Sequence, residues 1–389
     1  MRSYRFSRSF LWAVCFFALY FSASTAKAAA TAAFRVGVCL SLSGEFESYG
    51  RINLAGMRLF LDDYNARADT HKMELLVRDD KSDPDEAARI VAEFAGDGVP
   101  IVLGPVTSNI MLSMLQEAKK HGIVVLSPAA TSRLIGKKGD WGFKVLPGDD
   151  YQGKALARFF RRHMGTERAA VIVNGHFEYG RLLHEAFRET YAAEGGTIVS
   201  EERYNWDLEA AKRPDFVPLL SRTLAKRPDV VLLPGYAKEA VEIIRQAERL
   251  PADVIFCGGD SWLNHHEIFQ AGPRLADSYY IGGAEIYANT PSAKRFVELL
   301  DASDDPDLEP YSVNGYDVMM LVAEVIKSGA LTPEAIRDTL YTMRSFPLAA
   351  GRLTYDEDFG TAKTLYIYHI SQMNNDFYTE MVAEVEPAG

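Results

Sequence analysis

The sequence predicts an α/β protein with two doubly wound, Rossmann-like lobes. Three observations support this class. Strand-like and helix-like segments alternate along residues 34–126, and the alternation restarts over residues 151–257. Alternation at these lengths is typical of βαβ units and a parallel sheet, so two runs predict two lobes. The tail after residue 278 extends neither run simply and is long enough to return to each lobe, which predicts several crossovers.

The first run contains four predicted strands and three predicted helices. Short apolar stretches predict the strands, which cover residues 34–40, 73–78, 101–103 and 124–126. The helices are predicted over residues 50–68, from Asp83-Pro84-Asp85-Glu86 onward, and over residues 109–121. The run from Asp83 onward has Asp at the N-cap, Pro in the first turn and acidic residues near the positive end of the helix dipole. This pattern is typical of a helix N-terminus.

A polar loop at residues 133–141 separates the two runs. The second run is predicted to form helices at 151–164, 179–193, 216–225 and 238–249, and strands at 169–173, 197–203, 230–233 and 254–257. In the tail we expect strands at 279–281, 364–370 and 377–382, and helices at 291–300, 311–327 and from Thr332-Pro333-Glu334 onward.

The N-terminus is predicted to be a signal peptide, residues 1–28. Three arginines precede an apolar run at residues 10–21, and Ala26-Lys27-Ala28 follows as a small-x-small cleavage site. Bulky residues before Cys15 make a poor lipidation motif, which favours simple cleavage. No later stretch approaches the roughly 20 apolar residues of a membrane span. We therefore expect an exported, periplasmic protein.

Charge and cysteine content narrow the function further. Cleavage after Ala28 would remove four of the 42 basic residues and none of the 53 acidic ones, leaving a net charge of −15. An acidic exported protein is a poor partner for nucleic acid or anionic lipid. Cys39 and Cys257 follow strands of different predicted lobes, which favours buried free thiols over a disulfide. Neither cysteine has metal-ligand spacing.

Two short runs point to a binding pocket. Residues 104–108 (GPVTS) and 127–131 (SPAAT) each follow a predicted strand and contain only small or hydroxylated side chains apart from proline. Ligands of α/β sheets lie outside the carboxyl ends of strands, where a helix N-terminus offers free N–H donors. We therefore expect a pocket for a small carboxylate or another polar headgroup. The alternative is that Ser127 and Thr131 only bond neighbouring backbone in a turn.

Seven motifs in order carry a family resemblance. They are Ser41-Leu42-Ser43-Gly44 with Tyr49-Gly50, the two runs above, Phe143-Lys144 with residues 149–153 (DDYQG), Tyr179-Gly180, Gly235-Tyr236 and Gly258-Gly259-Asp260. Together they resemble the type I periplasmic binding proteins, specifically the leucine/isoleucine/valine-binding receptors of ABC transporters. The resemblance covers essentially the whole mature chain. It implies a Venus-flytrap fold with three crossovers, an N-terminal lobe of residues 30–146 and 283–352, and a C-terminal lobe of residues 147–282 and 353–389.

The resemblance also implies residues for an amino-acid headgroup. Ser108, Ala129 and Thr131 would hold the α-carboxylate and share the ammonium group. A hydroxyl and backbone N–H donors suit an anion independently of the resemblance. Asp260 would pair with the ammonium group, and the alternative is a turn residue or a helix N-cap.

Aromatic residues complete the implied site. Tyr179 and Tyr236 match second-lobe contacts of the family, and Tyr49 and Tyr311 match positions near the ligand side chain. The alternative for each is an ordinary core or surface tyrosine. Trp262 follows Asp260 by two residues and is predicted to lie within reach of the cleft, where its size would affect the choice of ligand.

Neither a metal nor a catalytic site is expected. His265 and His266 are adjacent, and neighbouring helical residues point about 100° apart, so they do not easily share one ion. The chain contains no His-Glu-x-x-His, P-loop or Gly-x-Ser-x-Gly motif. The acidic stretch 301–307 is interpreted as an exposed loop, with weak calcium binding as the alternative. No cofactor is predicted.

The sequence therefore favours a non-enzymatic, monomeric receptor that captures a small amino acid, aliphatic or aromatic, by closing its two lobes. By resemblance it would deliver this ligand to an ABC permease. Three alternatives stay open. The same fold would bind an aromatic acid, amide, urea or choline-like amine; it would act as a ligand sensor for a separate signalling protein; or the chain would be a hydrolase using Ser108 or the pair of histidines.

Overall fold

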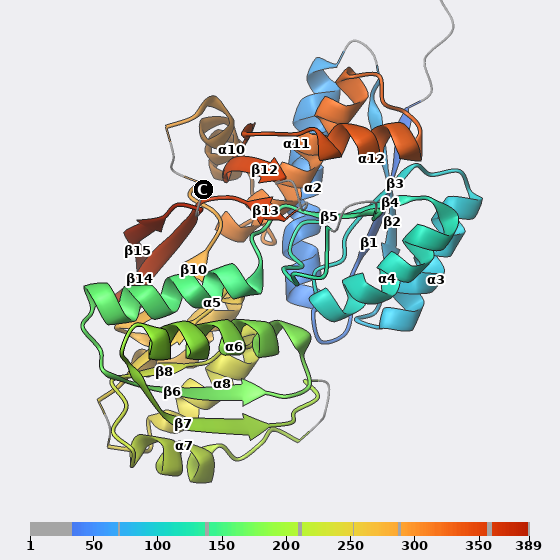
Figure 1. Cartoon of the computed structure of the whole chain (residues 1–389). Coiled ribbons are helices and arrows are strands. Elements are labelled where there is room, and N and C mark those ends of the chain that lie inside the picture. The colour runs from blue at the N-terminus through green and yellow to red at the C-terminus, as the bar shows by residue number, and fades with distance from the viewer. Residues whose placement is uncertain are drawn as a thin grey trace, which may run out of the picture.

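The computed structural model describes residues 33–68, 71–136, 140–208, 212–251, 253–286, 289–355 and 360–387. The predicted signal peptide lies outside these residues. The described chain forms two α/β lobes, each built around its own sheet (Figure 1). Within these ranges every helix is too short or too polar to cross a membrane.

The first lobe contains a five-stranded parallel sheet in the order β2-β1-β3-β4-β5. Its strands are β1 (Phe34–Leu40), β2 (Met73–Asp79), β3 (Ile101–Leu103), β4 (Val124–Ser127) and β5 (Gly142–Lys144). The accompanying helices are α2 (Glu47–Arg67), α3 (Pro84–Gly96), α4 (Ser108–His121), α10 (Pro291–Asp301), α11 (Val313–Lys327) and α12 (Pro333–Tyr341). Glycines at 56 and 315 allow α2 and α11 to pack closely, since a Cβ at either would lie within about 2 Å of the facing backbone.

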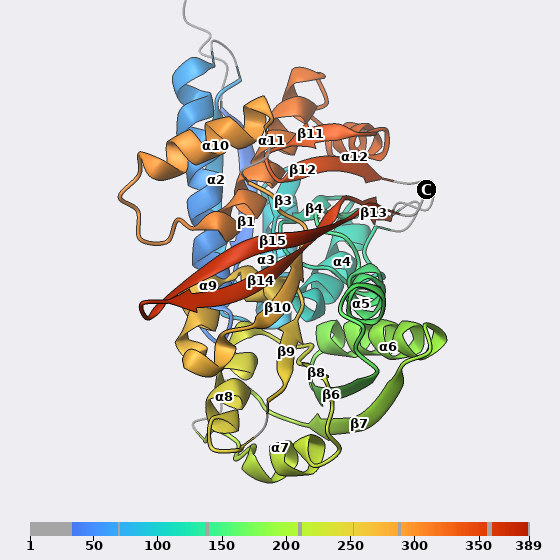
Figure 2. The ribbon, with the colours of Figure 1, turned by 90° about the vertical axis from the view of Figure 1, so that its left-hand side faces the viewer.

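The second lobe contains a seven-stranded sheet in the order β15-β14-β10-β9-β8-β6-β7. Five strands run parallel: β6 (Arg168–Asn174), β7 (Thr197–Tyr204), β8 (Val230–Leu232), β9 (Ile255–Gly258) and β10 (Ser278–Gly282). The hairpin of β14 (Leu365–Met373) and β15 (Asp376–Val385) adds antiparallel strands and forms a twisted ribbon beside the junction of the lobes (Figure 2). The helices are α5 (Asp149–Arg158), α6 (Glu178–Ala193), α7 (Val217–Leu224), α8 (Ala237–Ala247) and α9 (His265–Ile268).

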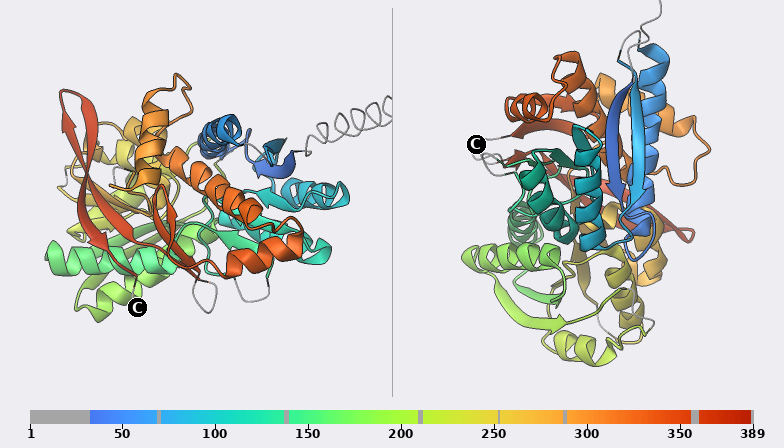
Figure 3. Two further views of the ribbon diagram at one scale, coloured as in Figure 1. Left: turned by 90° about the horizontal axis from the view of Figure 1, so that it is seen from above. Right: turned by 90° about the vertical axis from the view of Figure 1, so that its right-hand side faces the viewer.

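Three connections join the lobes, as Figures 1 and 3 show from different sides. They link β5 to α5, β10 to α10, and β13 (Thr361–Ala362) to β14. The strand β13 belongs to a small antiparallel sheet with β11 (Phe346–Leu348) and β12 (Gly351–Tyr355). The predicted architecture of two doubly wound lobes with three crossovers is confirmed.

Most predicted elements are present with ends moved by a few residues. Asp83 caps α3 by accepting from Asp85 N–H and Glu86 N–H, and Thr332 caps α12 by accepting from Ala335 N–H, as the sequence pattern predicts. The helix expected at 151–164 continues as a short π-helical turn after α5. The prediction omitted β5, β11, β12 and β13, because these short strands contain Gly, Pro or polar residues and show neither alternation nor an unbroken apolar run.

The two cysteines among the described residues are free thiols. Cys39 lies in β1 of the first sheet and Cys257 in β9 of the second, and both are fully buried. The predicted free thiols are confirmed, and the alternative of a disulfide is wrong. Burial raises the pKa of both thiols, which keeps them protonated.

Candidate ligand-binding cleft

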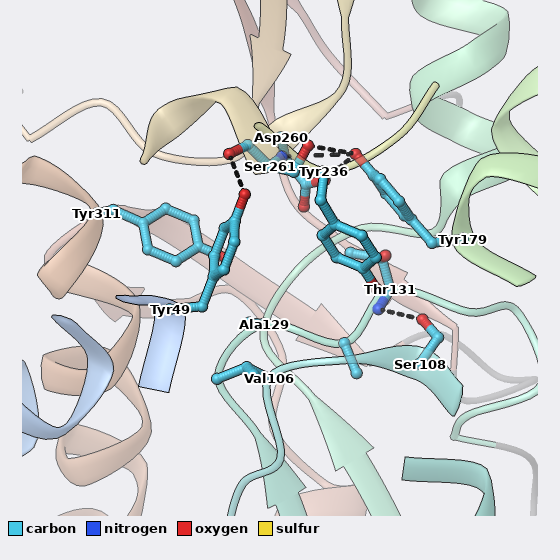
Figure 4. Close-up of a pocket in the computed structure, with 11 residues that line it drawn as sticks. Tyr49, Val106, Ser108, Ala129, Thr131, Tyr179, Tyr236, Asp260, Ser261 and Tyr311 are labelled. Atoms are coloured by element: carbon cyan, nitrogen blue, oxygen red, sulfur yellow. Dashed lines mark hydrogen bonds between the residues drawn. The ribbon is translucent and has the colours of Figure 1, made fainter. Parts of the chain in front are cut away.

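A small cavity lies between the lobes, with a volume of about 20 Å³ for a water-sized probe (Figure 4). This is room for about one water molecule. Eight of the nine residues predicted from the sequence line it: Tyr49, Ser108, Ala129, Thr131, Tyr179, Tyr236, Asp260 and Tyr311. Val106, Ala130 and Ser261 line it as well and were not singled out by the sequence analysis, although each lies within two positions of a predicted residue.

The first-lobe end of the cavity presents hydrogen-bond donors. Ser108 is the first residue of α4, whose N-terminus carries the positive end of the helix dipole. The Ser108 hydroxyl accepts from Thr131 N–H at 3.3 Å and from Ser132 N–H at 3.1 Å. A hydroxyl oxygen accepts two hydrogen bonds and donates one, so the Ser108 proton is left to donate to a ligand. This end is suited to a carboxylate.

Ser127 shapes the same loop without lining the cavity. Its hydroxyl accepts from Ala129 N–H at 3.2 Å and Ala130 N–H at 2.7 Å, and donates to the Pro105 carbonyl at 2.7 Å. The turn-forming alternative is therefore confirmed for Ser127. Its three bonds hold the two predicted headgroup runs against each other.

The second-lobe end presents a buried carboxylate. Asp260 begins a 3₁₀ turn, Asp260–Leu263, directly after β9, and accepts from the Tyr179 hydroxyl at 2.9 Å. Tyr179 also lies 3.4 Å from the Ser261 hydroxyl, which donates to the Gly235 carbonyl at 2.7 Å. Burial raises the pKa of Asp260 to about 6, although the Tyr179 bond opposes the shift.

A second buried carboxylate, Asp149, lies within electrostatic reach of the first. It is the first residue of α5 and is completely buried. Neither of its oxygens makes a hydrogen bond of normal geometry, although the Thr131 hydroxyl is near enough to favour the charged form. Burial raises the pKa of Asp149 well above its usual value, and the charge of Asp260 raises it further.

Asp260 is the one charged side chain among the described lining residues, so this end suits a cation. Asp149 lies outside the lining, and the charge of Lys144 favours its ionised form. The sequence analysis quoted Asp149 only as part of a crossing motif. The sequence feature that could have identified Asp149 is the acidic pair Asp149-Asp150. This pair lies where the chain was predicted to cross between the lobes beside the cleft.

The glycines before Asp260 make room for side chains of the protein itself. A Cβ on Gly259 would lie 2.2 Å from the Tyr179 hydroxyl, and a Cβ on Gly258 would lie 2.1 Å from the Trp262 ring. Trp262 is fully buried and does not line the cavity, so its predicted place at the cleft is wrong. A 3₁₀ helix has about three residues per turn, so side chains two positions apart point to different sides. Trp262 therefore packs on Gly258, while Asp260 lines the cavity.

Aromatic rings from both lobes surround the rest of the cavity. The Tyr49 hydroxyl, from α2 of the first lobe, donates to the Ser261 carbonyl and accepts from Ala237 N–H, both at 3.0 Å (Figure 4). The Tyr49 ring contacts the rings of Tyr236 and Tyr311 with centroids 5.9 and 6.0 Å apart. Tyr49 therefore bridges the two lobes, and the structure is a closed form.

The alternatives of a metal or catalytic site find no support in the described part of the chain. No group of three or more His, Cys, Asp or Glu side chains there is placed to hold a metal ion. His265 bonds the Tyr280 hydroxyl at 3.0 Å, and burial lowers the pKa of its imidazole to about 4. Ser108 is bonded to backbone amides and not to a base.

Comparisons with known proteins agree with this geometry. Residues 33–375 match the periplasmic binding protein family. The chain is 28% identical to the Leu/Ile/Val-binding protein BraC3 of Rhizobium johnstonii, over 83% of this chain and 87% of the relative. It superposes on the branched-chain amino acid transporter substrate-binding protein LivJ of Streptococcus pneumoniae, solved with isoleucine, with a TM-score of 0.80 and 27% identity, covering 91% of this chain and 100% of that one.

The fold is shared with a more distant solute-binding protein. An ABC transporter protein from R. palustris, solved with 4-hydroxybenzoate, has a TM-score of 0.79 and 16% identity, over 91% of this chain and 97% of that one. The family consists of solute-binding proteins, so the chain is not an enzyme. Fold, cleft and sequence together show that it belongs to the periplasmic binding proteins of type I, in the Leu/Ile/Val-binding group.

Proposed function

We propose that this protein captures a zwitterionic amino acid outside the cytoplasm and delivers it to an ABC permease. The observation that carries the proposal is the pair of opposite ends in one cavity. Ser108 and the N-terminus of α4 suit a carboxylate, and the carboxylate of Asp260, with Asp149 nearby but outside the lining, suits an ammonium group. An α-amino acid carries both groups at one carbon, so it satisfies both ends at once.

The remaining lining suits an apolar side chain. Tyr49, Tyr236, Tyr311 and Val106 offer aromatic and aliphatic surface, and the cavity is small. We infer an aliphatic or aromatic amino acid as ligand. Relatives named as Leu/Ile/Val-binding proteins support this class. An aromatic acid such as 4-hydroxybenzoate would bring no cation to the buried carboxylate of Asp260.

Binding and closure are one step in this proposal. The lobes, residues 30–146 with 283–352 and residues 147–282 with 353–389, move as bodies about the three crossovers. A ligand that contacts both lobes stabilises the closed form over the open one. Export through a cleaved signal peptide of residues 1–28, and action as a monomer, belong to the same proposal.

A thermal-shift panel on the mature protein, residues 29–389, tests the function. The panel contains L-amino acids, their deaminated acids, their decarboxylated amines and 4-hydroxybenzoate. A ligand present at 100 times its dissociation constant is expected to add about 2.7 kcal/mol to the free energy of unfolding. We expect stabilisation by aliphatic or aromatic L-amino acids alone. Stabilisation only by acids without an ammonium group would contradict the proposal.

A further inference from the structure

A second and larger cavity lies where the β14–β15 hairpin runs past β10 and α9 (Figure 2). Its volume is about 380 Å³ for a water-sized probe, against about 20 Å³ for the cleft, and this is enough for a small organic molecule. Met381 lines the second cavity and has 43% of its surface exposed, so the cavity reaches solvent. The proposed amino-acid function makes no use of this space.

Five aromatic side chains in the wall of the second cavity form an unbroken series of ring contacts. In order of contact they are Tyr368, Tyr280, His265, Phe269 and Phe377. Tyr368 stacks on Tyr280 with centroids 5.1 Å apart, and Phe269 stacks on His265 at 4.7 Å and on Phe377 at 5.2 Å. His265 meets Tyr280 at an interplanar angle of 74°. Two stacks therefore meet almost at right angles, and the wall presents rings in two directions.

The pairing of the hairpin explains which side chains of β15 reach the wall. Phe377, Thr379 and Met381 are spaced two residues apart, so they share one face of the strand, and all three line the cavity. Tyr368 of β14 lies opposite Met381 in the ladder. The register shifts at this point, so Val382 has no partner residue in β14, and it is not among the lining residues.

The charge around the second cavity is negative. Its described lining residues include no lysine or arginine, and the acidic residue among them is Glu285, whose carboxylate accepts from the Tyr368 hydroxyl at 3.3 Å. Burial raises the pKa of the Tyr280 hydroxyl, and the negative charges of Glu309 and Glu285 raise it further. Burial lowers the pKa of His265 to about 4, so at neutral pH its ring is uncharged and does not repel a cation.

Aromatic rings beside a carboxylate favour a cation with an apolar body. The face of an aromatic ring is negative, and quaternary ammonium groups are recognised by cages of such rings. An anion would be repelled by the ring faces and by Glu285. An uncharged solute of the same shape would bury the same apolar area but would gain nothing from the charge of the wall.

The second cavity shares two segments of its wall with the cleft. Leu263 lines it and belongs to the same 3₁₀ turn as Asp260, which lines the cleft. Pro310 lines it and is followed by Tyr311, which lines the cleft from the first lobe. Residues 284–286, on the connection from β10 to α10, complete this side. An occupant of the second cavity would therefore contact both lobes and one crossover.

We propose that the second cavity binds a small organic cation with a quaternary or methylated ammonium group, and that this occupant stabilises the closed form of the lobes. A ligand of the cleft stabilises the same form, so each ligand raises the affinity for the other by the same factor. Binding of the cation does not depend on the proposed amino-acid function. Only the coupling between the two sites depends on it.

The test compares choline with 3,3-dimethylbutan-1-ol, an uncharged isostere in which a tert-butyl group replaces the trimethylammonium group. Calorimetry on the mature protein, residues 29–389, measures both affinities with and without saturating L-leucine. We expect choline to bind at least about tenfold more tightly than the isostere, and several-fold more tightly again when L-leucine is present. Absence of choline binding at millimolar concentration, equal affinity for the isostere, or competition between choline and L-leucine would overturn the proposal.

Two lysine substitutions on β15 form a matched pair. Met381→Lys brings a positive charge to the wall of the cavity at a side chain that is already 43% exposed, and should weaken choline binding at least about tenfold. Val382→Lys adds the same charge at the next residue, which is equally exposed and outside the lining, and should change the affinity less than about twofold. Equal losses in the two variants would show a general effect of surface charge and refute the site.

Phe377→Leu tests the rings without adding a charge. It removes one ring of the series and keeps an apolar side chain, so choline should bind several-fold more weakly while the isostere changes less than about twofold. An equal loss for the isostere would mean that the ring only fills space. If L-leucine does not bind to the wild type, the amino-acid function is contradicted, while the comparison of choline with its isostere and the three variants still decides whether the second site exists.

Discussion

The carboxylate end of the cleft and its ammonium end are built in opposite ways. In the first lobe, Ser127 and Lys144 hold the loop, and the Ser108 hydroxyl already accepts two amides. In the second lobe, Asp260 accepts from the Tyr179 hydroxyl, and Asp149 is fully buried with neither oxygen in a hydrogen bond of normal geometry.

The contrast shows where selectivity arises. A preorganised anion site costs little to keep empty, because its polar groups bond one another. Two buried carboxylates are costly in a closed cleft until a cation arrives. A ligand's ammonium group therefore offsets the desolvation cost of the buried carboxylates. Its carboxylate adds hydrogen bonds to a site whose own polar groups are already paired. Each prediction below tests this difference, beginning with the largest effect.

The largest effect is expected for Asp260→Asn. The substitution keeps the shape and removes the charge, so an ammonium group loses the partner that Tyr179 positions. Loss of one partner of a buried pair typically costs 3–5 kcal/mol, so L-leucine should bind at least about a hundredfold more weakly. The affinity for 4-methylpentanoate, which is leucine without the ammonium group, should change little, as calorimetry on both probes would show. Equal losses would remove Asp260 from the ammonium site.

Ser108→Ala should have the next largest effect. It removes the hydroxyl proton that is left for the ligand and leaves Thr131 N–H and Ser132 N–H without their acceptor. We expect about tenfold weaker binding of both L-leucine and 4-methylpentanoate. The amine 3-methylbutan-1-amine, which is leucine without the carboxylate, serves as the internal control, and a comparable loss for it would argue against the carboxylate assignment.

The carboxylate end could be predicted from the sequence because its information is local. Runs of small, hydroxylated residues after apolar strands identify the two loops without any long-range contact. The same reasoning could not decide which of Ser127 and Thr131 binds the ligand and which only forms the turn, since the sequence does not show which hydroxyl faces the turn. Only the structure shows that Ser127 bonds Pro105 while Thr131 lines the cavity.

The ammonium end was predicted in part, because it depends on how distant segments meet. Asp260 was found through its motif. The placement of Asp149 near Asp260 requires the first crossover to bring α5 against the turn after β9, where Gln152 accepts from Asp260 N–H, and no local pattern encodes this. Trp262 was misplaced because its closeness to Asp260 in the sequence does not fix its direction: in the 3₁₀ turn that follows Gly259, side chains two positions apart point to different sides.

Asp149→Asn should separate affinity from stability. Because the folded pKa of Asp149 is raised, its charge destabilises the ligand-free protein at pH values above its ordinary pKa. We expect the variant to bind L-leucine several-fold more weakly and to be more stable without ligand by about 1 kcal/mol in urea unfolding at pH 7. Asp150→Asn, half-buried and paired with Lys154, is the control that should change neither. If Asp149→Asn were less stable than the wild type, the buried charge of Asp149 would not destabilise the ligand-free protein, and this explanation would be wrong.

A smaller effect is expected from pH at the rim of the cleft. Glu267 on α9 and Glu309 before Tyr311 lie on opposite lobes, and burial raises their pKa values to about 7 and about 8. The Ser48 hydroxyl and Lys238 face Glu267, and the His266 ring lies 3.8 Å from Glu309. The closed form therefore holds protons that the open and unfolded forms release.

Stability should accordingly be greatest at low pH and fall as pH rises toward 8. Each glutamate contributes a slope of at most about 1.4 kcal/mol per pH unit between its ordinary pKa and its raised one. Urea unfolding of the wild type and Glu309→Gln from pH 5 to pH 8 measures the difference. We expect a flatter curve for the variant, and parallel curves would show that Glu309 does not titrate in this range.

The smallest effect on binding is expected for Trp262→Phe, even though Trp262 follows Asp260 by only two residues. Its ring packs on Gly258 and is fully buried outside the cavity, so a smaller ring leaves a void in the second lobe and not in the cleft. Large-to-small core substitutions of this kind cost about 1–3 kcal/mol of stability. The affinity for L-leucine should stay within about twofold, because Asp260 keeps its bond to Tyr179. A tenfold change in affinity with unchanged stability would mean that Trp262 reaches the ligand, and that the 3₁₀ turn rearranges on binding.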